Sequence, residues 1–250
     1  MNLLPERFNK EQILFGCDAR LKLILAAMLL MMVLTHDGFF FPLAVAASGL
    51  LLCARMGVPS RILLVRFSEP AFIALVLILL KSFCTGGIPF VGFSLLGLKI
   101  TMYADGLREG LMIASRIIGS VTVIAVLSFS TPFTGIISAL SWFRVPKGLI
   151  EISIFAYRYI FMLFEEATVI YNAQKNRLGY SNLRRGLSSF GILAGSLTLK
   201  SLEHSQNTAL AMRQRGYDGT VPLARHKSFK PLEVAVSALL IILMGLLWIL

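Results

Sequence analysis

Charged side chains are scarce in this sequence of 250 residues: Asp, Glu, Lys and Arg together make up 15%, whereas apolar residues make up 56%. A water-soluble domain carries roughly a quarter charged residues, so this composition excludes an ordinary soluble protein. The apolar residues also occur in long blocks, as membrane spans require. The sequence therefore predicts an integral membrane protein.

Signatures of metal, redox and nucleotide chemistry are also missing. The three cysteines form no CxxC pair: Cys17, Cys53 and Cys84. The three histidines show no HxxxH or HExxH spacing: His36, His204 and His226. Because clustered ligands mark such sites, we expect no metal site and no cofactor in this chain. The sequence has no G-x-x-x-x-G-K-[ST] loop, which excludes ATP binding by a Walker A motif.

Five apolar stretches are candidate membrane helices, which gives an all-α fold class. They are Leu21–Thr35, Phe39–Ala54, Ile62–Leu80, Leu107–Phe129 and Leu232–Leu250. A span needs about 20 residues, so the first two are short, and four and six spans are the alternatives to five. We expect four spans within 1–130, a region outside the membrane at 131–230, and a last span at 231–250.

Basic residues indicate how the chain crosses the membrane. Four basic residues lie before or at the start of the first stretch: Arg7, Lys10, Arg20 and Lys22. Arg55, Arg61 and Arg66 lie between or at the edges of the second and third stretches, and residues 144–230 carry 13 Lys or Arg against 5 Asp or Glu. Five alternating spans place all three regions on one face, which the positive-inside rule makes cytoplasmic. We therefore expect a cytoplasmic N-terminus and a C-terminus outside. The net charge of +11 then reflects membrane topology rather than nucleic-acid binding.

The region at 131–230 is too long and too apolar for a simple loop. Helical spacing predicts a short helix at Gly135–Trp142 and long helices at Pro146–Asn176 and Leu187–Gln214. Each long helix ends with an arginine: Arg177 is followed by Leu178 and Gly179, and Arg215 by Gly216. Arginine suits the negative end of a helix dipole, and glycine suits the left-handed position just after a helix, so Gly179 and Gly216 are expected at that position. Two such ends in the most basic region also suit bidentate docking on acidic grooves of a partner.

Short motifs are spread along the chain: Asp18-Ala19-Arg20-Leu21-Lys22, Thr131-Pro132-Phe133, Tyr157-Arg158-Tyr159-Ile160-Phe161, and Ala211-Met212-Arg213-Gln214-Arg215-Gly216-Tyr217-Asp218-Gly219. With these motifs the sequence resembles the T component of energy-coupling-factor (ECF) transporters, in particular the CbiQ branch of cobalt and nickel importers. The resemblance runs almost from end to end, and its most specific part is the run from 211 to 219.

The resemblance implies a coupling role for the two long helices. Family members carry two Ala-Arg-Gly-type motifs on cytoplasmic coupling helices, and each docks into a groove of one ATPase subunit. On this chain the matching positions are Asn176, Arg177 and Leu178, and Gln214, Arg215 and Gly216. Asn176 and Gln214 replace alanine and Leu178 replaces the first glycine, so the two arginines match the pattern best.

The same resemblance implies the partners and the location. Two ABC-type ATPase subunits, a CbiM-like substrate-binding membrane subunit and a small accessory membrane subunit are the candidate partners, in the cell membrane of a bacterium or archaeon. Because the selective site would belong to another subunit, the sequence leaves the cargo open between cobalt, nickel and a vitamin.

Two other functions compete with this interpretation. An intramembrane hydrolase would use Glu165 and Glu166, but neighbouring groups to assist a general base are missing from the sequence around them, and a surface ion network with Arg158 is the simpler interpretation. A secondary transporter would show internal repeats, which this sequence lacks. Arg116, inside the fourth span, needs a partner, and Glu69 is a candidate.

Overall fold

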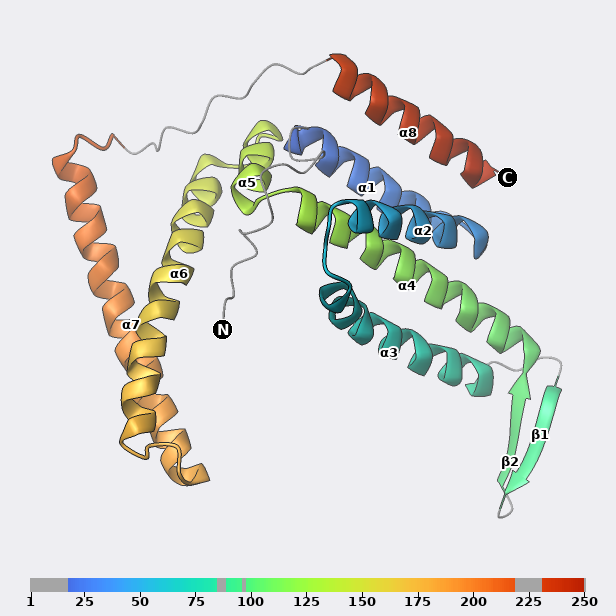
Figure 1. Ribbon diagram of the computed structural model, residues 1–250, viewed down its shortest axis with the longest axis horizontal. Coiled ribbons are helices and arrows are strands. Elements are labelled where there is room, and N and C mark those ends of the chain that lie inside the picture. The colour runs from blue at the N-terminus through green and yellow to red at the C-terminus, as the bar shows by residue number, and fades with distance from the viewer. Residues whose placement is uncertain (1–17, 85–88, 96–97, 219–230, 250) are drawn as a thin grey trace. The chain divides into compact units, whose positions relative to one another are not determined.

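A computed structural model of the chain describes residues 18–84, 89–95, 98–218 and 231–249 (Figure 1). Its elements follow in chain order: α1 (Ala19–Thr35), α2 (Phe40–Arg55), α3 (Ser60–Cys84), β1 (Pro89–Leu95), β2 (Leu98–Tyr103), α4 (Ala104–Ser130), α5 (Phe133–Trp142), α6 (Lys147–Asn176), α7 (Leu183–Gln214) and α8 (Pro231–Ile249). The chain divides into two compact units, one of residues 1–136 with 227–250 and one of residues 137–226.

The first unit is a helical membrane structure. Among the described residues, three helices are long and apolar enough to cross a membrane: α3, α4 and α8. They correspond to the third, fourth and fifth predicted spans. The first two predicted spans form α1 and α2, of 17 and 16 residues, which are shorter than a usual span. The all-α membrane class is confirmed, while the count of five crossings and their sidedness stay predictions.

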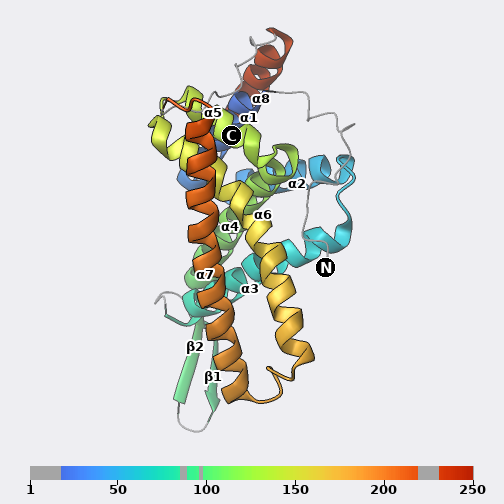
Figure 2. The ribbon, with the colours of Figure 1, turned by 90° about the vertical axis from the view of Figure 1, so that its left-hand side faces the viewer.

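Helix α4 is the centre of the first unit and packs against α1, α2 and α3 (Figures 1 and 2). Glycines on α4 allow this close approach. A Cβ on Gly106 would overlap the Lys81 carbonyl oxygen, and one on Gly110 would lie 2.9 Å from the Ile78 Cα. On the α2 side, a Cβ on Gly119 would lie 2.9 Å from the Pro42 carbonyl oxygen. Because the hydrocarbon core offers little hydrophobic force between helices, close backbone packing is the main source of association.

Helix α8 runs beside α1 in the same direction. At one end, the backbone N–H of Asp18 donates to Glu233 Oε2 at 3.1 Å. At the other end, the rings of His36 and Trp248 lie 6.3 Å apart. Met244 of α8 also packs against the small apolar core. The last helix therefore joins the N-terminal helices although they are more than 200 residues apart in sequence.

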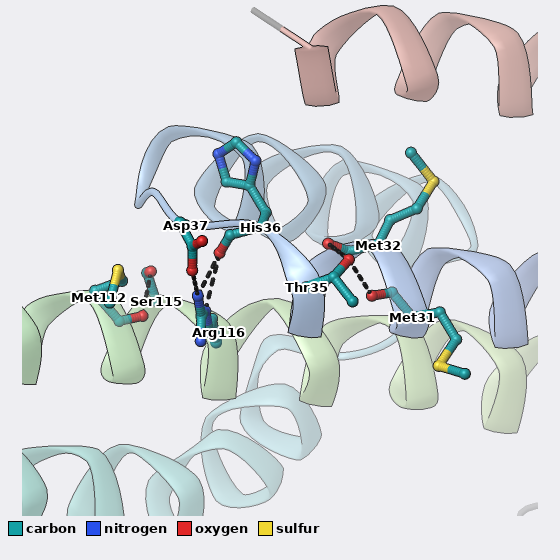
Figure 3. Close-up of polar contacts among 8 residues, drawn as sticks. All are labelled: Met31, Met32, Thr35, His36, Asp37, Met112, Ser115 and Arg116. Carbon is teal, nitrogen blue, oxygen red and sulfur yellow. Dashed lines mark hydrogen bonds and ion pairs between the residues drawn. The ribbon is translucent and has the colours of Figure 1, made fainter.

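Arg116 of α4 holds the turn between α1 and α2 (Figure 3). Its Nε donates to the His36 carbonyl oxygen at 3.1 Å, and its Nη2 pairs with Asp37 Oδ1 at 3.0 Å. The expectation of Glu69 as partner is wrong, because Asp37 lies in the turn that Arg116 faces, whereas Glu69 is exposed on α3. The guanidinium thus satisfies a carbonyl at the end of α1 as well as a carboxylate.

An antiparallel hairpin, β1–β2, lies between α3 and α4 in the sequence, where no regular element was predicted. Its register pairs Phe93 with Ile100 and Ser94 with Lys99. Aromatic and β-branched residues favour such strands. The hairpin leads directly into α4 at Ala104.

The close α3–α4 contact gives a first prediction. Gly110→Val should lower the free energy of unfolding by about 1–3 kcal/mol, because the added side chain meets the α3 backbone. Gly245→Val in α8 is the matched control, since a Cβ there has open space. Thermal unfolding of the detergent-solubilised chain measures both, and equal shifts would contradict the proposed packing constraint.

Candidate functional site

The second unit is dominated by the α6–α7 hairpin, two long antiparallel helices (Figures 1 and 2). Side-chain hydrogen bonds fix the connection between them. Gln174 Nε2 donates to the Ser189 carbonyl oxygen at 2.9 Å, and the Tyr180 hydroxyl donates to Gln174 Oε1 at 2.7 Å. Ser189 Oγ donates in turn to the Gly179 carbonyl oxygen at 3.0 Å. Gln174, which the sequence analysis did not single out, is therefore the centre of the hydrogen bonds that fix the turn.

Helix α7 ends in a complete Schellman motif. The N–H of Tyr217 donates to the Met212 carbonyl at 3.0 Å, and that of Gly216 to the Arg213 carbonyl at 3.1 Å. Gly216 has φ of +78°, the left-handed conformation that this motif requires and that glycine adopts without strain. Arg215 is the C-cap residue, so the backbone around it is fixed on both sides.

Helix α6 ends in the same motif with a different residue at its left-handed position. The N–H of Gly179 donates to the Gln174 carbonyl at 2.9 Å, and that of Leu178 to the Lys175 carbonyl at 3.0 Å. Leu178, not Gly179, has the positive φ, +57°. The sequence-based placement of Gly179 at this position is therefore wrong by one residue. Gly179 is needed for space instead, because a Cβ there would lie 2.7 Å from Ser189 Oγ.

Arg177 and Arg215 thus occupy the same C-cap position of two like helix ends. Asn176 and Gln214 are the last helical residues before them. The structure does not bring the two ends together: Arg177 lies at the turn of the hairpin and Arg215 at the far end of α7. Since α7 has 32 residues, a rise of about 1.5 Å per residue separates the arginines by roughly 45 Å.

Arg215 lines a groove of about 480 Å³ between α6 and α7. Arg158 and His204 line the same groove, together with the apolar side chains of Phe155 and Met212. Two guanidinium groups and an imidazole around an apolar floor suit a carboxylate presented on a partner protein. Arg158 therefore belongs to this groove, and among the described residues no ion pair joins it to Glu165 or Glu166.

Glu166 joins the middle of α6 to α7. Its Oε1 lies 2.9 Å from His204 Nε2 and 3.6 Å from Lys200 Nζ. The hydrogen bond to His204 and the charge of Lys200 lower the pKa of the Glu166 carboxyl group below its ordinary value. A carboxylate with a lowered pKa is a weaker base, which does not favour the hydrolase alternative. Glu165 is exposed on α6.

Two further hydrogen bonds join α6 and α7 in the half of the hairpin that lies away from its turn. The Tyr159 hydroxyl donates to Thr208 Oγ1 at 2.8 Å, and the Tyr217 hydroxyl donates to Glu151 Oε2 at 3.1 Å. Loss of solvent contact and the adjacent Glu151 raise the pKa of the Tyr217 hydroxyl. The residue directly after the second arginine motif is thereby tied to the start of α6.

Comparison with known proteins identifies the family. A sequence model of the cobalt transport protein family CbiQ matches residues 10–226. The chain belongs to the CbiQ family. An uncharacterised protein of Methanocaldococcus jannaschii is 30% identical over 207 residues, which are 82% of this chain and 77% of that protein.

Two further relatives of this CbiQ-family chain have informative names. A putative fused cobalt transport protein CbiMQ of Methanocorpusculum labreanum is 31% identical over 165 residues, 65% of this chain and 28% of that protein. The energy-coupling factor transporter transmembrane protein EcfT of Staphylococcus aureus is 30% identical over 142 residues, 52% of this chain and 53% of that protein. The chain thus spans about half or less of these two relatives.

The left-handed residue at each helix end gives a second prediction for this CbiQ-family chain. Leu178→Gly should raise the free energy of unfolding of the hairpin by about 1 kcal/mol, because it relieves the left-handed strain of a residue with a Cβ. Gly216→Ala, the reverse change at the matching position, should lower it by about the same amount. Chemical denaturation followed by the helical signal measures both free energies. Destabilisation by Leu178→Gly or stabilisation by Gly216→Ala would contradict the assigned conformations.

The Glu166 cluster gives a third, pH-dependent prediction. Because the folded-state pKa of Glu166 lies below its ordinary value of 4.5, its contacts stabilise the hairpin above that pH, and the contribution is lost as the pH falls through the lowered value. The protection of the α6 and α7 amides, measured as their exchange rate relative to the intrinsic rate at the same pH, should therefore fall on acidification. Glu166→Gln should reduce this loss of protection and Glu165→Gln should not, and equal behaviour of the two variants would count against the cluster.

Proposed function

We propose that this chain is the coupling subunit of an ECF-type ABC importer. In this role it hydrolyses no ATP itself. It transmits conformational changes of two ATPase subunits to a substrate-binding membrane subunit in the cell membrane. The observation that carries the proposal is the pair of arginine-capped Schellman ends, at Arg177 and Arg215, on one stiff hairpin.

The geometry supports docking at two separate points. Each arginine follows a rigid helix end, so its guanidinium starts from a backbone position that is already ordered, and less entropy is lost on binding. Roughly 45 Å between the two ends is enough for each to reach a different ATPase subunit. Asn176 and Leu178, and Gln214 and Gly216, are the neighbouring residues that we assign to the two docking motifs.

The names of the relatives support the proposed membrane partner and cargo. The fused relative carries the name CbiMQ, which supports a CbiM-like membrane subunit as the substrate-binding partner. The family description names cobalt transport, so we propose cobalt, or the chemically similar nickel, as the cargo. The selective ligands for the ion then belong to the partner subunit.

Charge reversal at the two caps tests the docking role. Arg177→Glu and Arg215→Glu should each weaken binding of an ATPase subunit by about thirtyfold or more, because a charge pair at an interface is replaced by repulsion. Co-purification of the tagged chain with its ATPases, together with cobalt uptake by cells, measures the effect.

Arg213→Glu is the matched control. Arg213 lies in the last turn of α7, two positions before the cap, and its side chain is exposed. It should leave the complex intact. Undiminished co-purification and uptake in the Arg177→Glu and Arg215→Glu variants would refute the assigned docking motifs.

A further inference from the structure

Residues 167–202, which form the turn of the α6–α7 hairpin and the helix segments beside it, contain no Asp or Glu. The same stretch carries five basic residues: Lys175, Arg177, Arg184, Arg185 and Lys200. Lys200 pairs with Glu166. For the other four, the described part of the chain shows no ion pair, so the turn region has an excess of positive charge on its surface.

Two of these charges lie where the helix itself disfavours them. Arg184 and Arg185 are in the first turn of α7, which starts at Leu183. The positive end of the helix dipole lies there, and a cation at that end loses stability. Within the described residues, the polar contact of these two side chains is a hydrogen bond of 3.4 Å from Arg185 Nη1 to Ser181 Oγ. An external anion would offset this unfavourable placement.

Large apolar side chains are exposed next to these arginines. Leu183, Leu187 and Phe190 are 86%, 67% and 63% exposed, and their spacing of four and three residues places them on one face of α7. Helix α7 has no buried residue, so this stripe has no partner within the described part of the chain. We call Leu183, Arg184, Arg185, Leu187 and Phe190, with Lys175 of α6, the basic–apolar surface.

We propose that the basic–apolar surface binds the membrane interface, with its cations on the phosphates of anionic phospholipids and its apolar stripe among the upper acyl chains. Basic residues beside an exposed Leu and Phe face are the pattern of an interfacial helix. The cytoplasmic leaflet, on whose side the charge pattern places this hairpin, carries the anionic lipids. This contact is separate from the ATPase docking proposed above and does not use Arg177 or Arg215.

The surroundings favour a lipid over a protein partner. Tyr171 and Tyr180 pack their rings 4.9 Å apart beside the turn, and tyrosine is enriched at membrane interfaces. In sequence the hairpin lies between α4 and α8, both long and apolar enough to span a membrane. It is thereby tethered to a bilayer, which raises the effective concentration of the lipid surface.

A local reporter on the full chain tests the proposal. Cys17, Cys53 and Cys84 are replaced by alanine, and Ala194→Cys, which continues the apolar stripe, carries an environment-sensitive fluorophore. The chain is placed in nanodiscs of phosphatidylcholine with or without phosphatidylglycerol, and quenching by brominated acyl chains is measured. We expect stronger quenching with phosphatidylglycerol, falling as salt is raised, and little change for a label at Gln206→Cys.

Two charge-matched double variants decide the origin of the effect. Arg184→Gln with Arg185→Gln should lower the equilibrium constant for contact with the phosphatidylglycerol surface about thirtyfold, because each basic residue near an anionic surface contributes roughly a factor of five. Lys147→Gln with Arg213→Gln removes the same charge elsewhere on the hairpin and should leave it unchanged. Leu183→Ser should reduce quenching without a change in charge, and unaltered helical signal confirms that each variant is folded.

Three results would overturn the proposal: equal quenching in both lipid mixtures, equal effects of the two double variants, or unchanged quenching in Arg184→Gln with Arg185→Gln accompanied by loss of ATPase co-purification. The last result would assign the surface to a protein partner. Because the reporter needs no ATPase, failure of the lipid proposal and failure of the coupling role are distinguishable.

Discussion

The closure of a helix by one left-handed residue is the constraint on which the functional part of this structure depends. Both α6 and α7 must satisfy their last carbonyl groups, and both do so with the same pair of backbone hydrogen bonds. That closure fixes the residue before it, which is an arginine in each helix. At Gly216 the conformation is free of strain, whereas at Leu178 a branched side chain is held in it. Strain of this kind persists only where the surroundings over-determine it, and the Gln174 network around the turn provides that support.

The hairpin is held together by polar contacts because it has almost no core. Helix α7 has no buried residue and α6 has one, Ile150. Two helices alone cannot surround an apolar interior, so register depends on hydrogen bonds and ion pairs spaced along them, from Gln174 at the turn through Glu166 to Tyr217 at the far end. Such contacts have geometric requirements that dispersion contacts lack. They leave the apolar faces available for other surfaces, which explains how a unit with little internal core carries so many exposed leucines.

The sequence predicts the long helices well and their contacts poorly. Helix α6 lies within one residue of its predicted bounds, and α7 starts four residues earlier than predicted, because apolar periodicity and end signals are local. The partner of Arg116 is not local: Asp37 is 79 positions away, and nothing in composition prefers it to Glu69. The left-handed conformation of Leu178 is missed for a different reason. Glycine occupies most left-handed positions after helices, so the sequence favours Gly179 over Leu178 there. The β1–β2 hairpin is missed because its apolar strand-forming residues lie between two predicted spans, where the sequence analysis predicted no regular element.

The two proposals together constrain how motion passes through the hairpin. A helix of 32 residues cannot shorten appreciably, so two ATPase subunits bound roughly 45 Å apart cannot approach each other along α7. Their movement must appear as a change of tilt of the hairpin or of the angle between α6 and α7. Contact of the basic–apolar surface with lipid would restrain the end near Arg177, and the end near Arg215 would then move further. A hairpin restrained at one end passes a change of tilt mainly to its other end, near Arg215, and the Tyr217–Glu151 contact lies at that end.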